Sequence, residues 1–152
     1  MSGVVQNLHV AGLLGQARFF SGLSKEQLER VAALGRTRSF PQDTRIYAVG
    51  DAVDDFYVLA EGMVRFTLGL GRRGETSAGD IIRRGEVFGW APLVEGHERR
   101  IATAYCLTPC EVVAIDGRAL NALMESDPEL GYALLKKLAV LLTSELVALA
   151  AG

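Results

Sequence analysis

The sequence predicts an α+β fold, in which an antiparallel β-roll, similar to a double-stranded jelly roll, is flanked by N-terminal helices and a long C-terminal helix. From Thr37 to Ile115 the apolar residues repeat every second position, whereas the period after Ile115 returns to 3.6. Glycine-containing turns separate many of the short apolar runs of the middle region. The 152 residues suffice for one core. We therefore expect a single domain over 1–152, helical in 1–35, a β-roll in 36–115 and helical in 116–152.

The N-terminal region contains two helix candidates. Val4–Ala17 is mixed and apolar and is assigned to a short helix. A second helix is expected to begin at Ser24, because Gln27 follows three residues later and completes a capping box. Gly35 is expected to end this helix in the left-handed conformation.

The middle region contains short strand candidates and no second alternation of strand and helix, which argues against a doubly wound parallel sheet. The expected strands are Arg45–Ala48, Phe56–Leu59, Met63–Leu68, Gly79–Ile82, Ile101–Cys106 and Glu111–Ile115. Pro109, between Cys106 and Cys110, suggests a hairpin that joins the last two strands. The glycine-rich stretch 69–74 does not have the spacing of a phosphate-binding loop of the P-loop type and is interpreted as a strand-to-strand tip.

The C-terminal region begins with Asp116, which can cap a short helix through Met124. Asp127 followed by Pro128 then marks the start of a helix that reaches close to Ala150. Leucines cover more of this helix than one packing face requires, so we expect it to form a homodimer contact. Glu145 falls where a seam built on leucines 135, 138 and 142 would continue, which argues against a long coiled coil.

Composition excludes several classes of function. The 16 basic and 18 acidic residues give a net charge of −2, so no global positive field favours nucleic acid. Two cysteines do not build a disulfide framework of the secreted kind, and His9 and His97 leave no multi-histidine metal site. No leader and no membrane-length apolar run is present, so we expect a cytoplasmic protein with no membrane contact.

Three segments combine glycines and apolar residues in a characteristic order. They are the opening Phe19–Ser24, the segment Gly50–Gly62, and the segment Gly85–Ala104 with its Gly-Glu-Val-Phe-Gly and Arg-Arg-Ile-Ala-Thr-Ala motifs. Together they resemble the cyclic-nucleotide-binding domain of the catabolite activator and fumarate–nitrate regulator superfamily, from about Phe19 to Leu149. The resemblance implies a sensor of cyclic AMP, cyclic GMP or another anionic small molecule, and no other cofactor.

The resemblance places a phosphate-binding cassette in the third segment. Gly89 would let the main chain approach the ligand anion, and Arg100 would supply a fixed cation. Around these two residues the expected binding residues are Phe88, Trp90, Arg99, Ile101 and Thr103. Binding would shift the C-terminal helix between two positions and so pass the signal to an unknown protein partner.

This sequence departs from the family pattern at two cassette positions. Trp90 stands where the family has a glutamate that binds the ribose 2′-hydroxyl, and Ile101 stands where a serine or threonine helps to hold the cyclic phosphate. Each lost hydrogen bond costs roughly 1–3 kcal/mol of binding free energy. The sequence therefore leaves an alternative open, in which a degenerate cassette binds no nucleotide and the domain serves dimerisation or protein interaction.

Other chemistries find less support. A metal-binding roll would need several histidines, and an iron–sulfur sensor would need about four thiolates where this chain has Cys106 and Cys110. No nucleophile with its base and orienting partner is visible, so we expect no enzyme. The helix-turn-helix that follows the long helix in transcription factors of this superfamily would begin near Gly152, so we expect no direct contact with nucleic acid.

Overall fold

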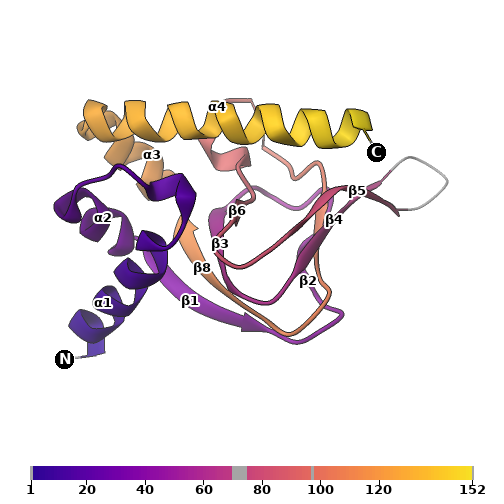
Figure 1. Cartoon of the computed structure of the whole chain (residues 1–152), viewed down its shortest axis with the longest axis horizontal. Coiled ribbons are helices and arrows are strands. Elements are labelled where there is room, and N and C mark those ends of the chain that lie inside the picture. Colours follow the sequence, from indigo (N-terminus) through magenta and orange to yellow (C-terminus); the bar gives the residue numbers. More distant parts are fainter. Residues whose placement is uncertain (1, 70–74, 97, 152) are drawn as a thin grey trace.

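Two four-stranded antiparallel sheets pack face to face, and helices cover the outer face of one of them (Figure 1). This computed structural model describes residues 2–69, 75–96 and 98–151. Most of the tip at 69–74 and His97 therefore lie outside the described residues. The expected α+β architecture, a β-roll with N-terminal helices and a long C-terminal helix, is confirmed.

The N-terminal helices are α1 (Ser2–Gly15), the 3-10 turn η1 (Arg18–Phe20) and α2 (Lys25–Ala32). The capping box at Ser24 and Gln27 is present, with both of its hydrogen bonds formed. The expected role of Gly35 is wrong, because α2 ends at Ala32 and Gly35 is the first residue of a strand. A Cβ atom at Gly35 would lie 2.9 Å from Val113 Cγ1, so this glycine serves a close strand-to-strand approach.

The strands fall into two sheets. The first sheet has the order β1-β8-β3-β6, formed by Gly35–Phe40, Cys110–Asp116, Asp55–Glu61 and Val87–Phe88. The second has the order β2-β7-β4-β5, formed by Arg45–Tyr47, Thr103–Cys106, Val64–Gly69 and Glu75–Ile82. All six expected strands are found with shifted ends. The sequence pattern missed β1, which is rich in polar residues, and β6, which has two residues.

The expected hairpin around Pro109 is wrong, because β7 and β8 belong to different sheets. The connection crosses from one sheet to the other, and both flanking cysteines are buried free thiols. Burial raises the pKa of the Cys106 thiol to about 12, so it stays protonated and behaves as a small apolar group.

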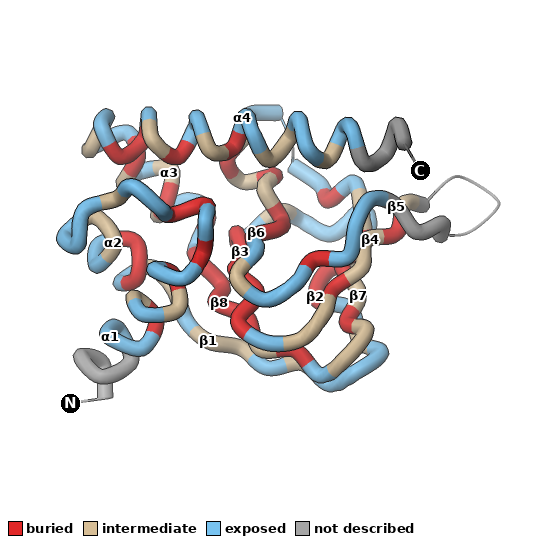
Figure 2. Tube along the Cα trace, in the orientation of Figure 1, coloured by how far each residue is buried: buried red, intermediate tan, exposed pale blue. Residues whose placement is uncertain are grey.

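Two cores share the central strands β3 and β8 (Figure 2). In β3, Phe56 and Val58 point to the core beneath the helices, whereas Tyr57 and Leu59 point to the core between the sheets. Successive side chains of a strand lie on opposite faces, so a strand buried on both sides has no polar position. This explains the uninterrupted apolar run that the sequence shows here.

The C-terminal region forms α3 (Gly117–Ser126) and α4 (Pro128–Ala151). Asp116 caps α3 through the backbone N–H of Ala119, and Asp127 accepts a hydrogen bond of 3.2 Å from the N–H of Leu130. The first half of α4 lies on the helix-side core, and the second half passes over the second sheet toward β5 (Figure 1). Among the described residues, none of the helices is long and apolar enough to cross a membrane.

Candidate functional site

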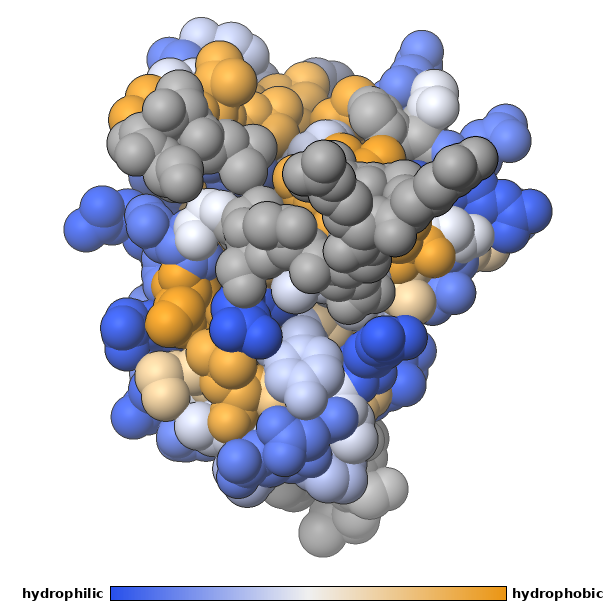
Figure 3. Space-filling model, turned by 90° about the vertical axis from the view of Figure 1, so that its right-hand side faces the viewer, coloured by the Kyte–Doolittle hydropathy of each residue, from blue (hydrophilic) through white to orange (hydrophobic). Residues whose placement is uncertain are grey.

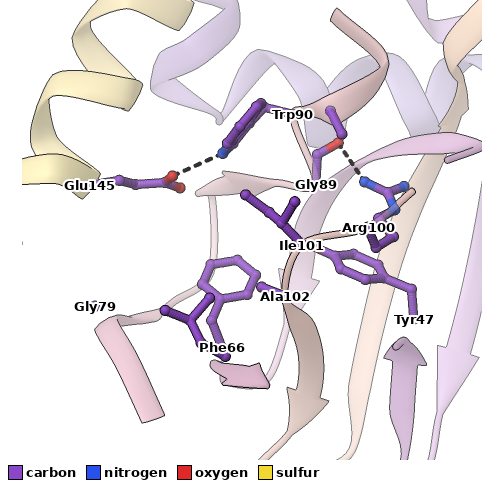
Figure 4. A pocket seen from close by; sticks show the side chains of 11 residues that line it. Tyr47, Phe66, Gly79, Gly89, Trp90, Arg100, Ile101, Ala102 and Glu145 are labelled. Atoms are coloured by element: carbon purple, nitrogen blue, oxygen red, sulfur yellow. Dashed lines mark hydrogen bonds between the residues drawn. The ribbon is translucent and has the colours of Figure 1, made fainter. Parts of the chain in front are cut away.

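A cavity of about 140 Å³ lies between the segment 89–102, the second sheet and α4 (Figure 4). Its walls come from strands of the second sheet, from the cassette and from the C-terminal helix. The lining residues are Tyr47, Phe66, Leu68, Gly79, Gly89, Trp90, Ala91, Arg100, Ile101, Ala102 and Glu145. Most of this lining is apolar, and Arg100 and Glu145 are its two charged side chains.

Arg100 is a buried arginine, with 3% of its surface exposed. Its Nη2 donates to the carbonyl oxygen of Asp55 at 2.6 Å and to the carboxylate of Asp54 at 3.2 Å. Its Nη1 donates to the carbonyl oxygen of Gly89 at 3.2 Å. Its Nε is buried and makes no hydrogen bond with any described residue. The protein thus fixes the guanidinium by its two terminal nitrogens and leaves Nε without a partner.

Aromatic rings hold the Arg100 side chain from the side. Its Cζ lies 4.1 Å from the ring centroid of Tyr47 and 5.8 Å from that of Tyr57. Tyr57 stacks in turn on Phe88, with ring centroids 5.1 Å apart. Desolvation by burial raises the pKa of Tyr47, while the charge of Arg100 acts in the opposite direction. Neutral aromatic faces beside a desolvated guanidinium stabilise its charge through cation–π attraction.

Gly89 provides the close approach between the cassette and the aromatic stack. Its φ is 73°, a left-handed conformation that favours glycine. A Cβ atom there would lie 3.0 Å from Cδ2 of Tyr57 and 3.2 Å from Nη1 of Arg100. The next turn is a 3-10 helix of three residues, Ala91–Leu93, in which Pro92 has no N–H to donate.

Trp90 connects the cassette to the C-terminal helix. Its indole Nε1 donates a hydrogen bond of 2.9 Å to Oε2 of Glu145, and Figure 4 shows this bond across the cavity. The second carboxylate oxygen, Oε1, is buried and has no hydrogen-bond partner among the described residues. Desolvation raises the pKa of Glu145, and the bond from Trp90 opposes that shift. A carboxylate from α4 therefore lies next to the cassette position that lacks its own.

Four of the seven expected binding residues line the cavity: Gly89, Trp90, Arg100 and Ile101. The other three lie outside the lining. Phe88 is fully buried in the core between the sheets. Arg99 is exposed and donates to the carbonyl oxygen of Gly50 at 3.3 Å. Thr103 is fully buried in β7, where its hydroxyl accepts from the N–H of Val49.

Sequence reasoning missed Tyr47 and Glu145. Tyr47 follows the apolar pattern of a strand and carries no signal of a site. Glu145 did carry a signal in the sequence. It is an acidic residue at the position where the leucine seam of α4 would continue, seven residues after Leu138. An acidic residue on the buried face of a helix costs stability unless it has a partner, so its position indicates a specific contact.

The donor set in the described part of the chain does not suggest a metal site. No three histidine, cysteine, aspartate or glutamate side chains come together there in an arrangement that could hold an ion. The cavity offers one cation, Arg100, and one carboxylate, Glu145, in an otherwise mostly apolar lining.

Similarity to known proteins covers most of the chain. The family profile described as the cyclic nucleotide-binding domain matches residues 37–127. The nitrogen fixation regulation protein FixK of Azorhizobium caulinodans is 33% identical over 106 residues, which cover 68% of this chain and 40% of FixK. The cyclic AMP receptor protein of Thermus thermophilus is 31% identical over 121 residues, which cover 79% of this chain and 55% of the receptor protein.

A solved structure has the same fold over nearly the whole chain. It is a putative cyclic nucleotide-binding protein from Geobacter metallireducens, with a TM-score of 0.75 and 24% identity, covering 96% of this chain and 98% of that one. This chain spans about half the length, or less, of the two curated relatives that it matches. The match of the family profile over more than half of the residues establishes that the chain belongs to the cyclic nucleotide-binding domain family.

Proposed function

We propose that this chain is a small-molecule-sensing regulatory domain, which holds a ligand anion beside Arg100 and passes the signal through α4. The observation that carries the proposal is the unpaired, buried Nε of Arg100 in the wall of the cavity. A buried donor without a partner costs about 1–3 kcal/mol, and an anionic ligand would remove that cost with a charge-assisted bond. Cyclic AMP is the first candidate ligand, since a relative carries it in its name, and cyclic GMP is the second.

The size of the cavity supports a role for α4 in the response. Pockets for drug-sized ligands have about 300–1,000 Å³, whereas this cavity has about 140 Å³. A cyclic nucleotide therefore requires one wall to move outward. Through Val147 the second half of α4 has no buried side chain, and a ligand that binds better when this half is displaced would shift its population.

Thermal unfolding with and without millimolar cyclic AMP or cyclic GMP tests the proposal. A ligand at a hundred times its Kd stabilises the folded state by roughly 2.7 kcal/mol, which raises the Tm of a domain of this size by about 5–10 °C. We expect Arg100→Gln to abolish the shift. Arg99→Gln is the matched control, because Arg99 is exposed and lies outside the lining. The thermal shift should persist in this variant.

The exposed side of α4 supports a second part of the proposal, a homodimer. Apolar surface (orange) is visible at the level of α4 in Figure 3. In the part of this helix whose side chains the structure describes, 128–147, five large apolar side chains are more than half exposed: Tyr132, Leu135, Val140, Leu146 and Val147. Sedimentation should give a dimer that Leu146→Lys dissociates. Leu8→Lys in α1 is the control, since Leu8 is equally exposed at 64% against 67% for Leu146.

The alternative function is a ligand-free interaction module. It is favoured by Trp90 and Ile101, which put apolar groups at the two cassette positions where the family has polar ones. No thermal shift with either nucleotide, together with a dimer that depends on Leu146, would favour this alternative. A shift that depends on Arg100 would exclude it.

A further inference from the structure

Two charged residues on opposite walls of the cavity each have a buried polar atom without a hydrogen-bond partner. Among the described residues three buried side-chain polar atoms have no hydrogen-bond partner, and two of them, Arg100 Nε and Glu145 Oε1, belong to lining residues. Figure 4 shows Arg100 at one side of the cavity and Glu145 on the helix at the other, with Ile101 between them. One atom is a donor and the other is an acceptor, so a single ligand could pair with both.

Glu145 lies on the core-facing side of α4 by its spacing. It follows Leu138 by seven residues and Leu134 by eleven, which are two and three helical turns. Both leucines are buried, and Leu141 and Leu142 between them and Glu145 pack against the same core. The sequence therefore directs a carboxylate toward the cavity from a face that is otherwise apolar.

Trp90 uses only half of the hydrogen-bonding capacity of this carboxylate. An indole has one N–H donor and no acceptor, so it can hold a single oxygen of Glu145. The bond fixes Oε2 at 2.9 Å and thereby orients the carboxylate, while Oε1 stays buried and unpaired. A purely structural tie between the cassette and α4 would not need the second oxygen to be desolvated.

We propose that Glu145 is a specificity-determining residue, which accepts a hydrogen bond from a hydroxyl or amino group of the ligand whose anion lies at Arg100. Trp90 acts as the positioning residue for this carboxylate. The acidic recognition group thus comes from the C-terminal helix, whereas the cassette position has a tryptophan. This inference rests on the proposed function, since it needs the ligand to occupy this cavity.

The ligand chemistry follows from the pair of charges. The ligand carries an anionic phosphate or carboxylate at one end and a hydrogen-bond donor at the other, with a flat or apolar part between them to match Ile101 and Phe66. Cyclic AMP offers two such donors, the ribose 2′-hydroxyl and the amino group of the adenine. Binding through Glu145 would also connect the ligand directly to α4.

Calorimetric titration of the full chain with three probes tests the inference. The probes are cyclic AMP, its 2′-deoxy analogue and its analogue without the adenine amino group. Glu145→Gln should weaken cyclic AMP about ten- to hundredfold, the equivalent of one hydrogen bond to a charged group. The same substitution should leave unchanged the affinity of whichever analogue lacks the donor that Glu145 binds. Glu129→Gln, an exposed glutamate in the first turn of α4, is the matched control and should bind like the unaltered chain.

The outcomes separate this inference from the proposed function. If Arg100→Gln abolishes binding while Glu145→Gln binds cyclic AMP normally, the sensor stands and the role of Glu145 falls. The role of Glu145 in specificity also falls if Glu145→Gln weakens the binding of all three probes equally. That result would mean that Glu145 only connects α4 to the cassette. If the unaltered chain binds none of the probes, this inference falls, whereas the proposed function is decided by the thermal shift with cyclic GMP.

Discussion

The two halves of α4 lie in opposite environments although they form one continuous helix. In the first half Leu130, Leu134 and Leu138 have 5% or less of their surface exposed and belong to the helix-side core. In the second half, through Val147, no side chain is buried to that extent, and Val140, Leu146 and Val147 are more than 60% exposed. The first half is an anchor, and the second half is a cover over the cavity.

This difference indicates where the domain can respond to a ligand at low cost. Displacing the first half would expose three leucines to water, at about 1.5–3 kcal/mol each. Displacing the second half would break the Trp90–Glu145 hydrogen bond and expose side chains that are already partly solvated. Regions with few buried apolar contacts supply the elements that move in regulation. The contrast can be tested by substitutions on each side.

The largest effect is expected from Leu134→Ala in the first half. Truncation of a leucine that is 1% exposed should lower the free energy of unfolding by about 2–5 kcal/mol. Val140→Ala in the second half should change it by about 0.5 kcal/mol or less. Urea denaturation measures both, and equal losses would contradict the division of α4 into anchor and cover.

An intermediate effect is expected at the cassette wall that faces the cover. Gly89→Ala adds a Cβ 3.0 Å from Tyr57 and 3.2 Å from Arg100, in addition to the strain of a positive φ. Gly50→Ala is the matched control, since its φ is 89° and a Cβ there meets nothing within 4 Å. We expect Gly89→Ala to be less stable than Gly50→Ala by about 1–3 kcal/mol, the cost of overpacking. If urea denaturation gives a difference near zero, the cassette is packed as loosely as the second half of α4.

The smallest effect is expected from the titration of Glu145. Its pKa is raised in the folded state by desolvation, so the folded chain retains the proton to higher pH than the unfolded chain. The free energy of unfolding from this group therefore falls as pH rises from the ordinary glutamate pKa of about 4.3 through the raised folded-state pKa. Glu145→Gln should remove this component and give a flatter stability profile above pH 4. An unchanged profile in Glu145→Gln would show that the carboxylate is solvated, as an open cover would leave it.

The sequence predicts the fold further than it predicts the site. The capping signals at Ser24, Asp116 and Asp127 mark three helix starts, because a cap is a local interaction that a few residues specify. The assignment of Gly35 fails because its close approach to Val113 comes from strand pairing far away in the sequence. The same is true of β6, whose two residues are defined by their pairing with β3.

Only part of the site can be predicted from the sequence, again because some of its contacts join residues that are far apart in the chain. The cassette motif locates Gly89, Trp90, Arg100 and Ile101, which lie in one short segment of the chain. Glu145 lies 55 residues from Trp90, and only the packing of α4 brings the two together. The interruption of the leucine seam marked Glu145 as unusual, but no local rule assigns it to the cavity.

The most direct test of the central claim uses Trp90 itself, the one tryptophan of the chain. Its indole lines the cavity and bonds to the cover, so its fluorescence reports on that place alone. Titration with cyclic AMP should give a saturable change of emission, which persists in Arg99→Gln and is lost in Arg100→Gln. No change of emission up to millimolar nucleotide, or an equal change in Arg100→Gln, would contradict a ligand site formed by the cassette and the second half of α4.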